Sequence, residues 1–183
     1  MELDLKKLAQ HIHENAKSKG FYDNKGYIFF NNAQVFEIIK EVAEFHEAYK
    51  KGKDGEGDWY LEDPEEIGES PVFLACIKDT WQDELADIMI RLLDYAAFVG
   101  FELPQYKPTK TDQVLDNYEL GSYCLDWVSK LTYMAYEKDN SYMTESFYYV
   151  LDFATMLNCN LEWHIEAKMA YNATRERLHG KKF

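Results

Sequence analysis

Two pairs of acidic residues, each pair three positions apart, are the residues of this chain whose types and spacing could do chemistry. Glu41 and Glu44 form the first pair, and Glu84 and Asp87 form the second. A spacing of three places both carboxylates of a pair on one face of a helix, within about one turn. Two such pairs facing each other would form a cage of oxygen ligands, the environment that Mg²⁺ prefers.

The apolar residues around Glu84 and Asp87 indicate that the charges of this second pair need partners. Most residues between Glu84 and Asp94 are apolar, so little of this segment can face water, and burying an unpaired carboxylate costs several kcal/mol. Arg91 lies four residues after Asp87 and three before Asp94, which would allow a ladder of salt bridges. A metal ion bound by both acidic pairs would also compensate the buried carboxylates. The spacing leaves both open, and acids on a solvated surface remain the simplest alternative for the first pair.

Helices must position these acids, and the hydrophobic pattern predicts an all-α protein. Apolar residues recur at spacings of three and four, and no segment alternates over a useful length as a strand would. A helical bundle is the expected architecture. We expect helices over 3–17, 31–51, 71–100 with a break near Asp79 and Thr80, 112–137, 143–158 and 161–178.

The length and composition predict a single domain over residues 1–183. The segment 52–70 is an acidic insert that we expect to be a loop, because eight acids and no base lie between Asp54 and Glu69, among glycines and a proline. The residues 94–103 align without gaps on 152–161, which indicates either two related hairpins or a chance likeness between amphipathic helices. If the two hairpins are related, Tyr142 and Glu145 stand at this offset where the first hairpin has its acidic pair, so chemistry would belong to the first hairpin.

The net charge indicates which partners to exclude, and the cysteines indicate the compartment. With 20 basic and 33 acidic residues, the chain carries a formal charge of −13, which argues against duplex nucleic acid or an anionic membrane as its main partner. We find no signal peptide and no apolar run of the length that a membrane span needs. Three widely separated cysteines are typical of reduced thiols, so we expect a cytoplasmic protein.

The acidic pairs stand in segments that resemble a known signature. Residues 40–48 and 84–94 resemble the ExxE and ExxD motifs of the MazG-like nucleotide pyrophosphohydrolases, members of the all-α NTP pyrophosphatase superfamily. Residues 168–183 are similar to the K-xxx-N-xx-R and HGKK ending of phage and bacterial MazG-like proteins, and residues 13–21 resemble their openings. The chain departs from compact members in two ways. The stretch between the two acidic pairs is longer, and an extra helical hairpin is expected at about 112–158. This hairpin resembles the degenerate second half of a duplicated domain, which packs against the active half.

The resemblance implies an enzyme that hydrolyses a nucleoside triphosphate, NTP or dNTP, to the monophosphate and pyrophosphate. It implies that Mg²⁺, or Mn²⁺ as a substitute, is held by Glu41, Glu44, Glu84 and Asp87. One carboxylate would then act as the base, with Glu44 and Glu47 as the candidates.

The basic side of the substrate site would come from the last helix. The resemblance implies that Lys168 and Arg175 neutralise phosphate oxygens, with Asn172 on the same face. A solvated basic face is the alternative. Trp81 flanks the acidic insert, as do Trp59 and Tyr60, so it is a candidate for stacking on the base, although such aromatic residues more often belong to a core.

Family members usually assemble as homo-oligomers, so the resemblance implies a dimer, with a monomer completed by its own extra hairpin as the alternative. Two other functions stay open. The chain could be a non-catalytic helical interaction module whose acids form ion pairs, or it could hydrolyse another nucleotide phosphate such as an alarmone.

Overall fold

The computed structural model describes residues 4–23, 26, 30–55, 57–105, 116–137 and 141–180. Over these residues the chain is helical and contains no strand, which confirms the predicted all-α class. None of the described helices is both long and apolar enough to cross a membrane. The helices are α1 (Leu5–Ser18), α2 (Phe30–Lys50), α3 (Pro64–Glu69), α4 (Trp81–Val99), α5 (Asn117–Glu137), α6 (Ser141–Met156) and α7 (Leu161–Thr174), with shorter turns η1 (Asp58–Leu61), η2 (Phe73–Ile77) and η3 (Arg177–Gly180).

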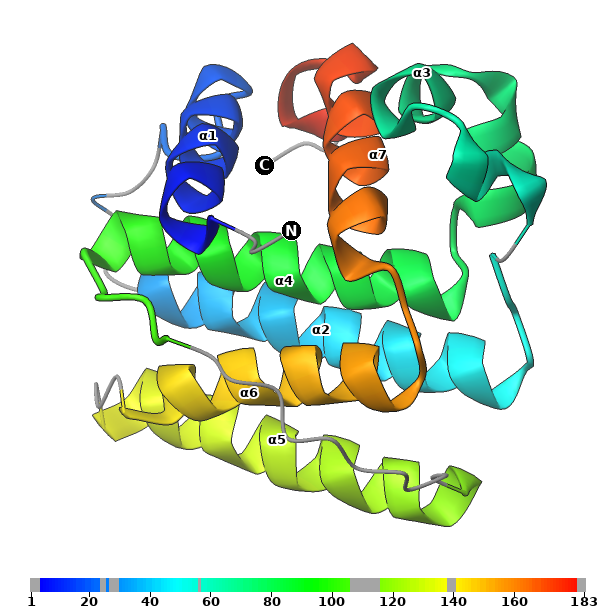
Figure 1. Ribbon diagram of the computed structural model, residues 1–183. Coiled ribbons are helices and arrows are strands. Elements are labelled where there is room, and N and C mark those ends of the chain that lie inside the picture. The colour runs from blue at the N-terminus through cyan, green and yellow to red at the C-terminus, as the bar shows by residue number, and fades with distance from the viewer. Residues whose placement is uncertain are drawn as a thin grey trace.

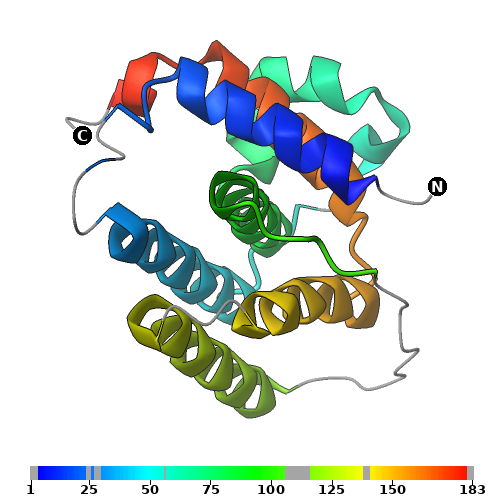
Figure 2. The ribbon, with the colours of Figure 1, turned by 90° about the vertical axis from the view of Figure 1, so that its left-hand side faces the viewer.

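Helix α4 lies at the centre of the molecule, as the two views in Figures 1 and 2 show. Helices α1 and α7 pack on one side of α4, while α2 and α6 pack against it from other sides. Helix α5 completes a four-helix arrangement by packing on α2 and α6. Because α4 is covered by four other helices, most of its residues are buried, as its apolar sequence predicts.

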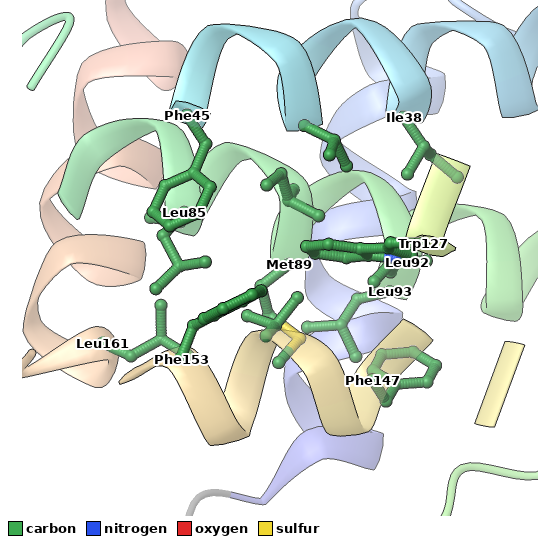
Figure 3. Close-up of a cluster of buried hydrophobic side chains, with 14 of the residues drawn as sticks. Ile38, Phe45, Leu85, Met89, Leu92, Leu93, Trp127, Phe147, Phe153 and Leu161 are labelled. Carbon is green, nitrogen blue, oxygen red and sulfur yellow. The ribbon is translucent and has the colours of Figure 1, made fainter. Parts of the chain in front are cut away.

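The main hydrophobic core lies between α2, α4, α5 and α6, with a contribution from the start of α7 (Figure 3). Large side chains from all five helices meet there, and Phe45, Leu85, Trp127 and Phe153 are almost completely buried. The extra hairpin of α5 and α6 therefore supplies, within one chain, the surface on which α2 and α4 pack.

The two segments of the predicted repeat end their helices in the same way. Gly100 (φ +68°) follows α4 and Asn158 (φ +52°) follows α6, and the two residues align in the repeat. Phe101 N–H donates to the carbonyl of Ala96, and the aligned Cys159 N–H donates to the carbonyl of Ala154, both at 2.8 Å. A left-handed residue with such a hydrogen bond is a common helix end. The likeness thus includes the backbone of the helix end as well as the hydrophobic pattern.

The acidic insert 52–70 is not only a loop, so that prediction was wrong over part of its length. It contains η1 and α3, because Asp63 caps α3 by accepting from the N–H of Glu65, Pro64 opens the helix, and acids in the first turn suit the helix dipole. Trp59, Tyr60 and Ile67 pack around a second small core with residues of η2 and α7.

The break before α4 was predicted correctly, whereas the end of the last helix was not. The predicted break near residue 79 is confirmed: Asp79 has φ +63° between η2 and α4. The last helix ends at Thr174 instead of Leu178, because Arg175 is extended and η3 follows. The predicted start of the fifth helix at residue 112 lies outside the described residues.

Candidate metal and phosphate site

Three of the four predicted metal ligands come together where α2 faces α4. One carboxylate oxygen each from Glu41, Glu84 and Asp87 lies within 4.8 Å of the others. The fourth, Glu44, is one turn further along α2, where its carboxylate lies 3.2 Å from the ammonium of Lys40. Glu44 lines the same cavity as the other three acids and lies nearer to solvent.

This cavity has a volume of about 220 Å³ and lies between α1, α2, α4 and α7. The two predicted acidic pairs form one side of it. Lys168, Asn172 and Arg175 reach it from the end of α7, so the structure brings the predicted metal ligands and the predicted phosphate ligands into one cavity. The residues from α7 lie more than 70 positions after the acids in the sequence. The packing of α7 on α4 brings the two sets together.

Glu84 is the uncompensated charge of this site. Its side chain is 7% exposed, and within the described part of the chain no hydrogen bond or ion pair reaches its carboxylate. Burial, together with the charges of Asp87 and Asp83, raises the pKa of Glu84 to about 8. Burial and Asp87 likewise raise the pKa of Glu41 to about 7, against the opposing charge of Arg91. Near neutral pH these raised pKa values favour the protonated carboxyls, and the three oxygens are close enough together that they could hold a cation instead.

Arg91 does not form the ladder with Asp87 and Asp94 that its spacing allowed. Its guanidinium lies 3.3 Å from the carboxylate of Glu41 and 3.6 Å from that of Glu37, so it pairs with α2 across the helix interface. Asp94 instead meets the ring of His13 from α1 at 2.7 Å. The ladder alternative is thus corrected: Arg91 compensates the buried Glu41, and the Asp87 carboxylate has another partner.

That partner is Lys168. Its ammonium is buried and lies 2.7 Å from Asp87 Oδ2 and 2.8 Å from Asp83 Oδ2. Burial alone would lower the pKa of Lys168, but the charges of Asp87 and Asp83 outweigh it and raise that pKa, so the lysine is charged. Lys168 therefore positions carboxylates instead of presenting a free ammonium. Sequence reasoning missed Asp83, although the spacing of four between Asp79, Asp83 and Asp87 could have indicated one face.

Arg175 supplies the positive group at the α7 side of the cavity. Its Nη1 donates to Asn172 Oδ1 at 3.3 Å, and its guanidinium carbon lies 5.5 Å from the centre of the Tyr171 ring. These contacts fix the orientation of the guanidinium at the edge of the cavity. The planar group can bind two oxygens of a phosphate at once.

Two predicted site residues lie elsewhere. Glu47 is exposed and its carboxylate lies 2.5 Å from the ammonium of Lys51, whose hydrogen bond lowers the pKa of Glu47 and makes it a weaker base. It borders a neighbouring hollow together with Glu44 and Glu84, outside the cavity described above. Trp81 is only 6% exposed, packs in the main core against Tyr49, and does not line the cavity. The structure therefore offers no surface of Trp81 on which a base could stack.

The raised pKa of Glu84 predicts that the metal-free protein becomes less stable as the pH rises from about 5 to 8. In this range the unfolded chain has already released the Glu84 proton, whereas the folded chain still holds it, so the free energy of unfolding falls, by on the order of 2 kcal/mol. A divalent cation replaces the proton and should stabilise the protein more at pH 8 than at pH 6. Urea unfolding of wild type and Glu84→Gln, with EDTA or Mg²⁺, measures this difference.

The Glu84→Gln variant serves as the reference, because its amide has no proton to lose in this range. If the stability difference between wild type and this variant stays constant from pH 5 to 8, the raised pKa of Glu84 is wrong.

Comparison of the chain with protein-family models, with curated proteins and with solved structures found no match.

Proposed function

We propose that the protein is a Mg²⁺-dependent pyrophosphohydrolase that converts nucleoside triphosphates to monophosphates and pyrophosphate. The observation that carries the proposal is the buried Glu84 carboxylate, which has no compensating partner and lies within 4.8 Å of oxygens from Glu41 and Asp87. Such an all-oxygen set fits a hard divalent cation. The resemblance of the acidic segments and of the last helix to MazG-like enzymes supports the same reading.

Each residue of the cavity has a role in this proposal. Glu41, Glu84 and Asp87 hold the cation, which when bound polarises phosphate oxygens and lowers the pKa of water. Glu44, which lines the cavity and is in contact with solvent, accepts the proton of the attacking water. Arg175 binds phosphate oxygens, while Asn172 orients its guanidinium.

The separation of acids and bases across the cavity explains how a very acidic protein would bind a polyanion. The carboxylates of α2 and α4 form one side and repel phosphate until a cation is bound. The α7 side carries the guanidinium of Arg175, so a triphosphate would lie between a metal ion and a fixed cation. Arg175 is needed beside the metal ion because the ammonium of Lys168 is already occupied by two aspartates.

A panel of NTPs and dNTPs, assayed for pyrophosphate and monophosphate, tests the proposal. We expect pyrophosphate release with Mg²⁺ or Mn²⁺, and none with EDTA. The panel includes a nucleotide with a second diphosphate on its 3′ oxygen, which distinguishes an alarmone hydrolase with the same metal site. Release of orthophosphate instead of pyrophosphate, or no turnover of any triphosphate, would refute the proposed reaction.

A further inference from the structure

A larger groove runs between α1, α3 and α7, and none of the residues proposed to act in the reaction lines it. Its volume is about 700 Å³, and Figure 1 shows α7 lying between α1 and α3 on one side of α4. The α7 residues that line it recur three and four positions apart from Glu162 to Ala173, so one whole face of this helix borders the groove over about 16 Å. Residues of α1 from Asp4 to Asn15 border it over the same length.

The side of the groove formed by α3 and α7 is acidic. Glu65 and Glu69 stand four residues apart on α3, and Glu162 and Glu166 stand four apart on α7, so each pair shares a helix face. Lys7 lines the α1 side, but no ion pair joins it or any other base of the described chain to these four acids. Partial burial and the charges of Glu162 and Glu65 raise the pKa of Glu166. The groove therefore attracts a partner that carries several positive charges.

These acids do not converge on a single ion. No three acids of the groove bring carboxylate oxygens within 4.8 Å of one another, in contrast to the acids of the reaction cavity. Glu162 and Glu166 lie about one helical turn apart, which is about 5 Å along α7. Charges spread along a helix in this way match a row of basic side chains better than they match a metal ion.

Apolar side chains line the groove beside the charges. They are Leu8 from α1 and Ile165, Met169, Ala170 and Ala173 from α7. The two alanines leave room next to the helix, because each side chain is a single methyl group. A simple polycation would gain nothing from this surface, whereas an amphipathic segment would bury its own apolar residues against it.

Tight packing of α3 on α7 holds the acidic side in place. A β-carbon at Gly68 would lie 2.1 Å from the backbone carbonyl oxygen of Ala167, so only glycine permits this close approach. The indole N–H of Trp163 donates to the carbonyl of Glu62 at 3.2 Å, which fastens the segment before α3 to α7. The acids of α3 are thus fixed before any partner arrives, and little ordering is needed on binding.

We propose that this groove docks a basic amphipathic helix of a partner protein, with its lysines or arginines against the acids and its apolar residues against α1 and α7. The length of about 16 Å admits three helical turns. Charge complementarity selects this occupant: the acids repel nucleic acid and anionic membranes, and a second copy of this chain carries a charge of −13. The inference is independent of the proposed hydrolysis, because the groove uses none of its residues.

Isothermal titration calorimetry of the full chain tests the docking with a synthetic peptide of about 14 residues, made of lysine, leucine and alanine with all leucines on one helix face. We expect one peptide per chain, bound in the micromolar range. Glu162→Gln combined with Glu166→Gln should weaken binding about tenfold, because two opposite charges are lost. A peptide of the same composition, with its leucines spread around the helix, should also bind about tenfold more weakly.

Glu119→Gln combined with Glu137→Gln is the matched control. Both residues are exposed on α5, outside the groove, and the pair changes the net charge by the same amount. This variant should bind the peptide as the wild type does. Equal weakening in the two double variants, equal binding of the two peptides, or no binding to the wild type would each overturn the docking site. A wild-type dimer that excludes the peptide would assign the groove to a second copy and would overturn it as well.

Discussion

Glu84→Gln is expected to lower kcat/KM for pyrophosphate release about a thousandfold. The substitution removes the carboxylate that has no other partner, and with it the charge that holds the cation between Glu41 and Asp87. Polarisation of a phosphate by a metal ion contributes several kcal/mol to the transition state, and each 1.4 kcal/mol is a factor of about ten in rate. Steady-state kinetics with the best triphosphate of the panel, at saturating Mg²⁺, measure the loss.

Glu84→Gln should remain folded, because the amide has nearly the same shape as the carboxylate and carries no buried charge. Its melting temperature without metal should equal or exceed that of the wild type near pH 8, and Mg²⁺ should no longer raise it. Glu47→Gln is the control on α2: this exposed residue pairs with Lys51, and its replacement should change kcat/KM by less than about threefold. Equal activity of the two variants would exclude Glu84 from the reaction.

Lys168→Met is expected to destabilise the fold by about 3–5 kcal/mol. Methionine replaces the aliphatic part of the side chain, but it leaves the buried Asp83 without its ion pair and removes the partner of Asp87. Breaking one side of a buried ion pair costs this much because the remaining charge is left uncompensated. For a domain of this size the melting temperature should fall by roughly 10 °C, measured by calorimetry without metal.

The chain offers a matched control in Lys130→Met. Lys130 also bridges two carboxylates at hydrogen-bond distance, Asp126 at 2.9 Å and Glu145 at 2.7 Å, but both are about half exposed. An exposed pair of this kind contributes no more than about 1 kcal/mol. Adding Asp83→Asn to Lys168→Met should restore part of the stability, because it removes the uncompensated charge. If the two single lysine variants melt alike, Lys168 is not a buried positioning residue.

The sequence by itself determined the long helices that carry the acids, and the faces of those helices on which the chemistry lies. A spacing of three places Glu84 and Asp87 on one side of α4 in any helix that contains them, and the apolar residues around them predict that this side is buried. Gly100 could likewise be read as a helix end, because a residue without a β-carbon adopts the left-handed conformation that closes α4. These features depend only on neighbours along the chain, so local rules suffice to predict them.

Only the tertiary structure decided which charges meet. Lys168 reaches Asp83 across 85 residues of sequence, and Arg91 turns to Glu41 on α2 and not to the aspartates of its own helix. Trp81 belongs to the core for the same reason: the packing of α2 on α4 covers it. Helical spacing gives the direction of a side chain but not what lies opposite it. The partner of each buried carboxylate, and the absence of one for Glu84 among the described residues, follow from how α2, α4 and α7 pack together.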